Sequence, residues 1–421
     1  MKTSAYVYPL KRAYEHHRYY VLSSLRWLVL ASITGLAVGA FSSIFSWCMT
    51  TVTQLRMTHD WLIYFLPAAG LVIVFLYQIA DMKNDKGTNQ ILSAIHASPR
   101  IRVRLAPLIF ISTVLTHLFG GSAGREGAAL QLGGSIGNGL GNLFRLKDDD
   151  KKVMVLCGMS AAFSALFGTP IAAAVFPLEV VSVGIMQYSA LLPCIFASLI
   201  ASRFAATMGI APEAFVITEI PALNFTPAVK IILVAGICGI ASTAFCFLLE
   251  LVHDKYAKLF KNLYLRILIA GVLVVAISLL LQTRDYNGAG IPVIERAMEG
   301  QVVWYAFLVK MLLTALTLGA GFKGGEIIPS LFIGATLGCL LGQLLGISPS
   351  LCAAVGMVSL FCGATNCPLS SLLIGFELFG FQAVYYILIA IAVSYGFSGY
   401  RSLYHQQNIV YSKYTSREHV R

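Results

Sequence analysis

GGSAGREGAALQLGGSIGNGLGNLFR, residues 120–145, decides how the rest of this chain can be interpreted. The stretch places Arg125 and Glu126 among glycines, directly before an apolar segment. A helix that begins there presents unpaired backbone N–H groups and the positive end of its dipole. Such a helix start binds anions, either the chain's own glutamate or a mobile ion. The alternative is that Glu126 is a helix cap in a water-exposed loop.

Glycines recur at every fourth position after the Arg-Glu pair, at Gly133, Gly137 and Gly141. On a helix this spacing lines one face with hydrogen atoms, so that another backbone can approach closely. We therefore predict that a second helix packs directly against this face. An ionisable residue is a candidate functional residue when it lies at the N-terminus of such a helix within the membrane.

The composition is that of a polytopic membrane protein, because 57% of the 421 residues are hydrophobic and only 12% are charged. Soluble domains carry about 25% charged residues. The nine cysteines occur singly, with no C-x-x-C pair, so neither a disulfide framework nor a metal site is expected. No cofactor is implied. The predicted fold class is therefore an all-α membrane protein in a lipid bilayer.

The net charge of +11 comes from basic residues that gather at the two ends of the chain and in loops. This positive-inside pattern predicts a multi-pass protein of the inner (plasma) membrane with both termini in the cytoplasm. A nucleic-acid-binding protein would need a basic face on a soluble domain, and the sequence offers none. Nucleic acid is therefore not an expected partner.

Eight apolar runs approach or exceed the roughly 20 residues that cross a bilayer. They span residues 27–51, 61–80, 103–120, 188–208, 226–251, 266–282, 303–321 and 383–399. Shorter pieces broken by Gly and Pro span residues 124–143, 153–167, 169–184, 325–346, 350–363 and 366–380. Broken segments in corresponding places are typical of transporters whose binding site lies where two repeats meet.

The two halves of the chain repeat each other. A shift of 201 residues places glycines and leucines on identical residues, from Gly87 on Gly288 to Gly141 on Gly342. A shift of 198 continues the match as far as Glu377, which corresponds to Glu179. The predicted organisation is a cytoplasmic or interfacial segment (1–24), a first membrane repeat (25–210), a linker (211–225), a second membrane repeat (226–400) and a basic cytoplasmic tail (401–421).

Two turns occupy matching positions in these repeats, GTNQI at residues 87–91 and GAGIP at residues 288–292. Each precedes a short helix-like run, as an anion-binding turn would. An ordinary cytoplasmic turn is the alternative for both.

Four motifs together resemble the CLC family of anion channels and anion/proton antiporters: GREGAALQLGG, GTNQI, GGEIIPSLFIGATLG (residues 324–338) and SGYRSLY (residues 398–404). The resemblance covers residues 25–405. It implies a homodimer with one independent pore in each subunit, built from an inverted repeat of tilted and broken helices. It also implies anion sites formed by helix N-termini and backbone N–H groups.

The resemblance assigns roles to particular residues. Glu126 looks like the gating glutamate, which occupies the outer anion site and swings away when protonated. Thr88 and Tyr404 would bracket the central anion, and Phe332 with the backbone of residues 326–329 matches the second-half anion loop. The anion-binding set implied in this way comprises Thr88, Asn89, Arg125, Gly127, Ile327, Ile328, Phe332 and Tyr404. Without the resemblance, Tyr404 is equally an interfacial anchor and Phe332 a core residue.

Several departures from chloride-type members favour fluoride over chloride. Those members have Pro where this chain has Ala128, and an apolar residue where it has Glu326. Chloride/proton antiporters also carry an inner glutamate where this chain has Val180. The changes resemble the fluoride/proton antiporter branch, whose motifs read approximately GNNLI, GREGT and GGEVTP. The match to that branch is imperfect, since Ile328 stands where its Thr would be.

A buried carboxylate without a partner is costly and tends to take up a proton. Our hypothesis is that Glu126 and Glu326 form a proton relay, and that hydroxyl and amide groups donate hydrogen bonds to fluoride. For Glu326 alone, a helix cap is the alternative.

The predicted function is therefore fluoride export in exchange for protons, and not an enzymatic reaction. A chloride channel or chloride/proton antiporter of the same fold is the main alternative. A remote alternative is an intramembrane serine hydrolase, because residues 120–124 and 133–137 both fit G-x-S-x-G and His117 lies near Ser122 in sequence.

Overall fold

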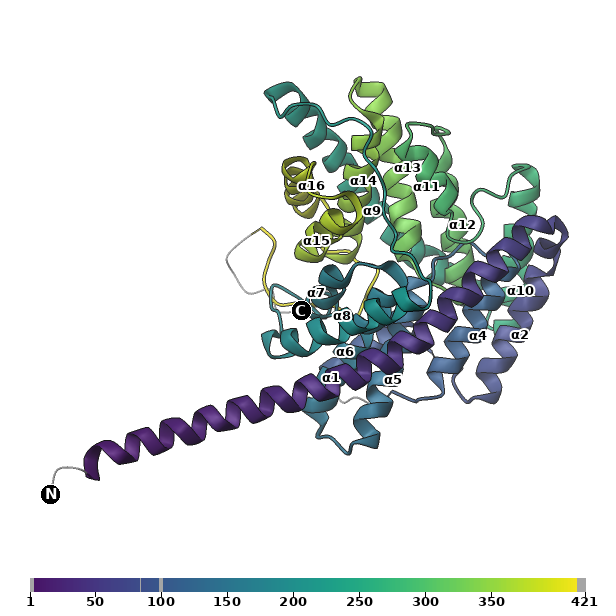
Figure 1. Cartoon of the computed structure of the whole chain (residues 1–421). Helices are drawn as coiled ribbons and strands as arrows, with labels where there is room; N and C mark the ends of the chain where they lie inside the picture. The colour runs from purple at the N-terminus through teal and green to yellow at the C-terminus, as the bar shows by residue number, and fades with distance from the viewer. Residues whose placement is uncertain (1–3, 84, 98–100, 415–421) are drawn as a thin grey trace.

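The computed structural model describes residues 4–83, 85–97 and 101–414, and that part of the chain is almost entirely helical (Figure 1). In the first half the elements are α1 (Ser4–Thr58), η1 (Asp60–Phe65), α2 (Leu66–Ile79), α3 (Thr88–His96), α4 (Leu105–Leu118), α5 (Glu126–Leu143), α6 (Asp148–Phe167), α7 (Pro170–Val180), β1 (Ser182–Val183), η2 (Tyr188–Ala190) and α8 (Leu191–Thr207). The second half contains α9 (Phe225–Leu259), α10 (Leu263–Leu280), α11 (Ile291–Met298), α12 (Ala306–Ala320), α13 (Ile327–Leu345), α14 (Pro349–Thr365), α15 (Pro368–Phe379), α16 (Val384–Phe397) and β2 (Asn408–Ile409).

Each predicted apolar run or broken piece corresponds to a helix. Within the described residues, six helices are long and apolar enough to cross a membrane, among them α9 and α13. Several of the others are short, such as the 11-residue α7 and the 12-residue α15, and helices of this length depend on tertiary packing. A mixture of long spans and short, broken helices is the arrangement that the apolar pattern predicted.

Helix α1 continues across the sequence-based boundary at residue 24. The expected N-terminal segment ended at residue 24, but a single helix runs from Ser4 through that point to Thr58 (purple in Figure 1). The chain has no proline between Lys11 and Thr58. The apolar part of α1 can therefore nucleate a helix that propagates back through the charged residues before it.

The glycine faces pack as predicted. A Cβ added at Gly133 on α5 would lie 2.1 Å from the carbonyl oxygen of Gly158 on α6. The same contact occurs between Gly334 on α13 and the carbonyl oxygen of Gly356 on α14, at 2.3 Å. Only hydrogen fits at such distances, so each pair of helices touches backbone to backbone. This packing holds the starts of α5 and α13 at fixed positions.

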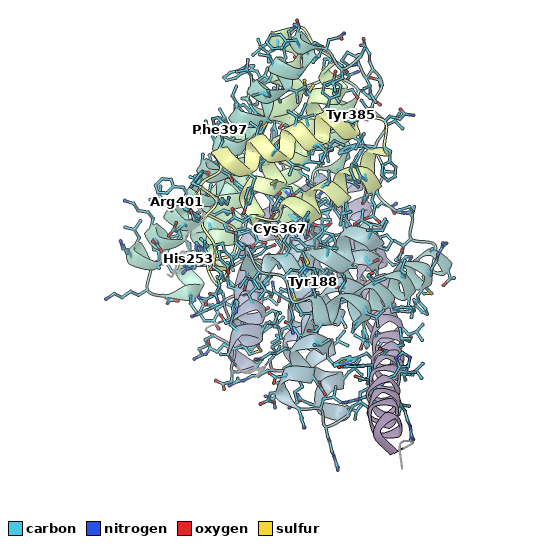
Figure 2. The ribbon with its side chains drawn as sticks, turned by 90° about the vertical axis from the view of Figure 1, so that its left-hand side faces the viewer. Tyr188, His253, Cys367, Tyr385, Phe397 and Arg401 are labelled. Atoms are coloured by element: carbon cyan, nitrogen blue, oxygen red, sulfur yellow. The ribbon has the colours of Figure 1, made fainter. Side chains whose placement is uncertain are left out.

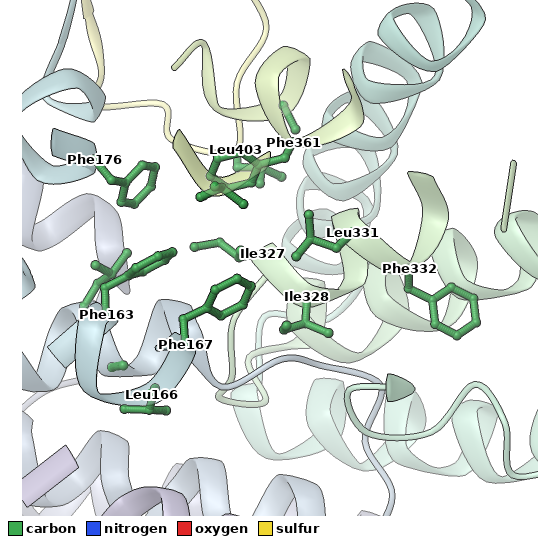
Figure 3. Close-up of a cluster of buried hydrophobic side chains, with 14 of the residues drawn as sticks. Phe163, Leu166, Phe167, Phe176, Ile327, Ile328, Leu331, Phe332, Phe361 and Leu403 are labelled. Atoms are coloured by element: carbon green, nitrogen blue, oxygen red, sulfur yellow. The ribbon is translucent and has the colours of Figure 1, made fainter. Parts of the chain in front are cut away.

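Aromatic and branched side chains fill the space between the halves (Figure 3). Phe163 and Phe176 from the first half have ring centroids 5.2 Å apart, and Phe176 lies 5.7 Å from Phe361 of the second half. Figure 3 shows Ile327 and Leu403 facing the same cluster. Burial of such large apolar side chains joins the two halves into one packed unit.

Two glutamates, one on α7 and one on α15, each cap the start of the other helix. Glu179 at the end of α7 accepts hydrogen bonds from the backbone N–H groups of Leu369 and Ser370, at 2.9 and 2.8 Å. Glu377 on α15 accepts from the N–H groups of Ile171 and Ala172 at the start of α7, both at 2.8 Å. Each glutamate therefore satisfies donors at the start of the other helix, which is a structural role.

The described part of the tail, residues 401–414, folds back onto the helices. Arg401, which follows α16 in Figure 2, forms an ion pair with Glu250 on α9. Further along, β2 pairs in parallel with β1, with Asn408 opposite Ser182. This return carries Tyr404 into the interior, where its side chain is 1% exposed.

Candidate functional site

The two glycine loops that precede α5 and α13 meet at the centre of the molecule. Gly124 and Gly325 form an isolated antiparallel bridge, in which each backbone N–H donates to the other's carbonyl oxygen at 2.7 Å. The bridge fixes the starts of α5 and α13 against each other. The first turns of both helices, which include Gly127, Ile327 and Ile328, thus present backbone N–H groups without intrahelical acceptors close to one point.

Glu126 and Glu326 lie on the two sides of this bridge. Glu126 is the first residue of α5 and is fully buried, and its Oε2 accepts a hydrogen bond from the N–H of Arg125 at 3.1 Å. A Cβ added at Gly127 would lie 2.8 Å from Oε2 of Glu326. The second carboxylate is therefore in contact with the helix that the first one begins. The sequence suggested that these residues cooperate, and the structure brings them together.

Buried polar atoms without a hydrogen-bond partner gather around the two carboxylates. Within the described residues they include Oε1 of Glu126, Oε2 of Glu326, Oε1 of Gln131 and the hydroxyl of Tyr404. The Tyr404 hydroxyl also interacts electrostatically with both glutamates. Buried polar groups in proteins are normally paired. Such a concentration of unpaired groups indicates a place where a mobile ion, a proton or water completes the contacts.

Thr88, at the start of α3, reaches the same place from the first turn motif. Its hydroxyl donates to the carbonyl oxygen of Gly127 at 3.3 Å, and the amide of Gln131 donates to the Thr88 hydroxyl at 3.3 Å. Gln131 was not among the residues singled out from sequence. The sequence could have indicated it, because Gln131 is a polar residue one helical turn after Gly127 in a mostly apolar segment.

Asn89, also expected at the anion site, is tied to the tail. Its side-chain oxygen accepts a hydrogen bond from the backbone N–H of Gln406 at 3.1 Å. The amide oxygen accepts this bond, and the N–H₂ group of Asn89 is the donor that could bind an anion. The contact also fixes the segment that contains Tyr404.

A cavity of about 970 Å³ opens onto the site. Thr88, Asn89, Gln131 and Glu326 all line it. Its wall carries seven basic or histidine side chains, Lys83, Lys86, His253, Lys261, Arg266, Lys323 and His405. Three of its lining residues, Asp85, Glu250 and Glu326, are acidic. The five lysine and arginine side chains outnumber the three acidic ones, and this excess of positive charge draws anions toward the glycine loops.

Phe332 lies away from the two carboxylates. Its ring contacts the second turn motif, where a Cβ added at Gly290 would lie 2.7 Å from the ring. Its other neighbours are Tyr286, with ring centroids 6.2 Å apart, and the ammonium of Lys310, 5.0 Å from the ring centroid. In Figure 3 the ring points away from Ile327. At the shift of 201 residues Phe332 corresponds to Gln131. In the second half an apolar ring therefore stands at the position from which, in the first half, the Gln131 amide contacts Thr88.

Arg125 also lies at the site. Its Nε is 3.5 Å from Oε1 of Glu126, and its Nη2 forms an ion pair with Glu213 at 2.9 Å. Glu213 belongs to the segment between α8 and α9, and nothing near it in sequence connects it with residues 120–127. Sequence reasoning missed it because the contact spans 88 positions.

The serine hydrolase interpretation is wrong. The Ser122 hydroxyl pairs with the hydroxyl of Thr314 at 3.1 Å, and His117 uses Nδ1 for the carbonyl oxygen of Thr113 at 3.0 Å. The hydroxyl of Ser135, in the second G-x-S-x-G match, donates to the carbonyl oxygen of Arg102 at 3.2 Å. A nucleophilic serine needs a base within hydrogen-bond reach, and among the residues that the structure describes neither serine forms a hydrogen bond with a histidine.

Comparisons with known proteins show which proteins this chain is similar to. The family described as "Voltage gated chloride channel" matches residues 68–399. A "Chloride/fluoride channel protein" from Pseudomonas syringae pv. tomato is 35% identical over 92% of this chain and 88% of its own length. A "CLC-type fluoride/proton antiporter" structure superimposes with a TM-score of 0.88, at 34% identity, over 91% of this chain and 98% of that chain.

More distant structures share the fold. A "slow cyanobacterial Cl-/H+ antiporter" superimposes with a TM-score of 0.76 at 21% identity, over 89% of this chain and 94% of that chain. The matched region contains the glycine loops, the turn motifs and the broken helices described above. The chain therefore belongs to the CLC family of anion channels and transporters, is a multi-pass membrane protein, and is not an enzyme.

Proposed function

We propose that this transporter exports fluoride in exchange for protons, with Glu126 as the gating carboxylate. The observation that carries the proposal is the Gly124–Gly325 bridge, which joins the starts of α5 and α13 next to Glu126 and Glu326. The buried polar atoms without hydrogen-bond partners on both glutamates support it further. A carboxylate and a halide compete for the same backbone N–H donors at the helix starts. Protonation of Glu126 removes its charge, frees those donors and lets an anion take its place.

Glu326 supplies a second proton-binding group. Its carboxylate lines the basic cavity and contacts Gly127, so it connects the cavity with the gate. A proton taken up by Glu126 can pass to Glu326 when the gating side chain moves. Val180 occupies the position of the inner glutamate of chloride/proton antiporters, and Glu326 would replace that group in the relay.

The chemistry of the donors supports fluoride. Fluoride is a stronger hydrogen-bond acceptor than chloride, and Asn89 and Tyr404 provide an amide and a hydroxyl donor around the site. The Thr88 hydroxyl can donate to fluoride once it releases the carbonyl oxygen of Gly127. Two similar proteins carry fluoride in their names, the channel protein from Pseudomonas syringae and the fluoride/proton antiporter. The anion-binding set is proposed as Thr88, Asn89, Arg125, Gly127, Ile327, Ile328 and Tyr404. Phe332, which the resemblance also implied, is left out because its ring packs against Gly290 and Tyr286.

We further propose two membrane repeats (25–210 and 226–400), a homodimer, and an inner-membrane location with both termini in the cytoplasm. The positive-inside pattern supports this orientation. Because the cavity is lined by tail residues such as Gln406, it then opens to the cytoplasm and receives the anions to be exported.

The proposal is tested with purified protein in proteoliposomes loaded with fluoride or chloride. Ion-selective and proton-selective electrodes follow both ions after the anion gradient is released. We expect fluoride efflux to drive proton uptake in a fixed ratio, and chloride efflux to be at least about tenfold slower, equivalent to about 1.4 kcal/mol. Equal rates for the two anions would instead identify a chloride-type transporter, and anion flux without proton movement a channel.

A further inference from the structure

Arg125 stands between two carboxylates that belong to different parts of the chain. On one side its Nε lies 3.5 Å from Oε1 of Glu126, whose side chain is 0% exposed. On the other side its Nη2 lies 2.9 Å from Oε1 of Glu213, whose side chain is 22% exposed. The guanidinium therefore forms ion pairs with a buried carboxylate and with a more accessible one at the same time. The shorter contact is the one to Glu213.

The remaining contacts of the guanidinium are weaker. Arg125 donates to the hydroxyl of Ser46 on α1 and to the carbonyl oxygen of Leu166 on α6, both at 3.4 Å. Among the ion pairs of the described residues, Glu213 and Glu126 are its two carboxylate partners. The backbone of Glu213 is itself held, because its N–H donates to the carbonyl oxygen of Phe167 at 3.2 Å. Glu213 is thus a fixed anchor for Arg125.

We propose that Glu213 is a positioning residue for the gate: by holding Arg125, it limits how tightly the ionised Glu126 carboxylate is bound. This inference rests on the proposed role of Glu126. Without Glu213, Arg125 has one carboxylate partner in place of two, and the repulsion between Glu213 and Glu126 is lost. Both changes stabilise ionised Glu126 where it blocks the anion, so the gate opens at a lower pH.

Other charged and titratable groups face this cluster. Glu326 precedes α13 and Tyr404 lies in the tail, and both belong to the site itself. His117 on α4 lies within electrostatic range of Arg125, and also of Arg56 on α1 and Lys310 on α12. None of these groups changes when Glu213 is replaced, so a substitution there isolates its own effect.

The test measures the initial rate of fluoride efflux from proteoliposomes as a function of external pH. It compares the wild type with Glu213→Gln, which loses the charge, and Glu213→Asp, which keeps it. Glu219→Gln is the matched control, since Glu219 is an exposed acid in the same linker. We expect Glu213→Gln to shift the profile toward acid by about one pH unit. Glu213→Asp and Glu219→Gln should follow the wild type.

A second comparison separates positioning from general damage. In a Glu126→Gln background the gate has no charge, so adding Glu213→Gln should leave the rate unchanged within about twofold. An unshifted profile for Glu213→Gln alone, or an equal loss of rate in both backgrounds, would overturn the inference. If the wild type moves fluoride without protons, the proposed antiport fails, while the pH profile of anion flux still decides the role of Glu213.

Discussion

Four side chains at the site keep buried polar atoms without a hydrogen-bond partner among the described residues: Glu126, Glu326, Gln131 and Tyr404. The Glu126 atom, Oε1, has only the 3.5 Å ion pair with Nε of Arg125. Leaving a buried polar group unpaired costs about 1–3 kcal/mol, and more when it is charged. A chain that only needed stability would have apolar residues here. The arrangement is understandable if an anion, water and protons occupy the site in turn, so that each polar atom is satisfied during part of the cycle.

The role of the second carboxylate can be tested by replacing Glu326 with Gln. The amide keeps the size of the side chain and its contact with Gly127, but it cannot carry a proton between the gate and the cavity. We expect proton flux per fluoride to fall at least about tenfold, which corresponds to about 1.4 kcal/mol. Simultaneous fluoride and proton electrodes would measure the ratio. Undiminished coupling would show that protons bypass Glu326.

A site residue could be predicted from the sequence only where a short motif around it identifies its role. Glu126 and Glu326 stand in glycine-rich motifs at helix starts, and a short window of sequence contains everything needed to recognise them. Glu213 is recognisable only through its contact with Arg125. Phe332 lies in the motif next to Glu326, but the helical rotation of α13 turns its side chain toward Gly290.

The positions of the helices determine where the residues of the site lie. The starts of α3, α5 and α13 converge on the site, and their positions depend on how each helix packs. For α5 and α13 the support is the backbone contact with α6 and α14. The four-residue glycine spacing predicted these contacts, because period and residue size alone determine them.

Replacing Gly133 with Ala should separate α5 from α6. The new Cβ would lie 2.1 Å from the carbonyl oxygen of Gly158, so the backbones must move apart. Overpacking of this kind costs about 1–3 kcal/mol. The control is Gly236→Ala on α9, where the nearest atom would be 3.9 Å away. Melting of the detergent-solubilised protein should show a lower Tm for the first variant only, and equal Tm values would contradict the packing argument.

An ion pair joins the turn before α3 to the loop before α13. The Lys323 ammonium lies 2.6 Å from Oδ2 of Asp85, and the two side chains are 16% and 1% exposed. Oδ1 of Asp85 also accepts a hydrogen bond from the N–H of Gly87 at 3.3 Å. The pair thereby fixes the turn that positions Thr88.

Lys323→Met should destabilise the protein by about 3–5 kcal/mol, because it leaves the Asp85 carboxylate buried and unpaired. The double variant Asp85→Asn/Lys323→Met removes both charges and should recover most of that loss. Equilibrium unfolding of the two variants and of Asp85→Asn alone gives the interaction energy. If the double variant is less stable than Lys323→Met, the two residues do not act as a pair.

On the scale of the whole molecule, the two halves meet at the Gly124–Gly325 bridge and at the aromatic cluster that contains Phe176 and Phe361. The number and order of helices were predictable, because apolar runs and glycine or proline breaks mark them in the sequence. The continuation of α1 to Ser4 was not, since charged residues are compatible with both a helix and a loop. The path of the tail was also missed, because the pairing of β2 with β1 joins segments that are far apart in the chain.

The central claim is that Glu126 is the group through which protons and fluoride exclude each other. Glu126→Gln tests it most directly, with fluoride and proton electrodes reading the same proteoliposomes. The claim predicts that fluoride still crosses the membrane while coupled proton uptake disappears. Proton uptake at the wild-type ratio in this variant would contradict it.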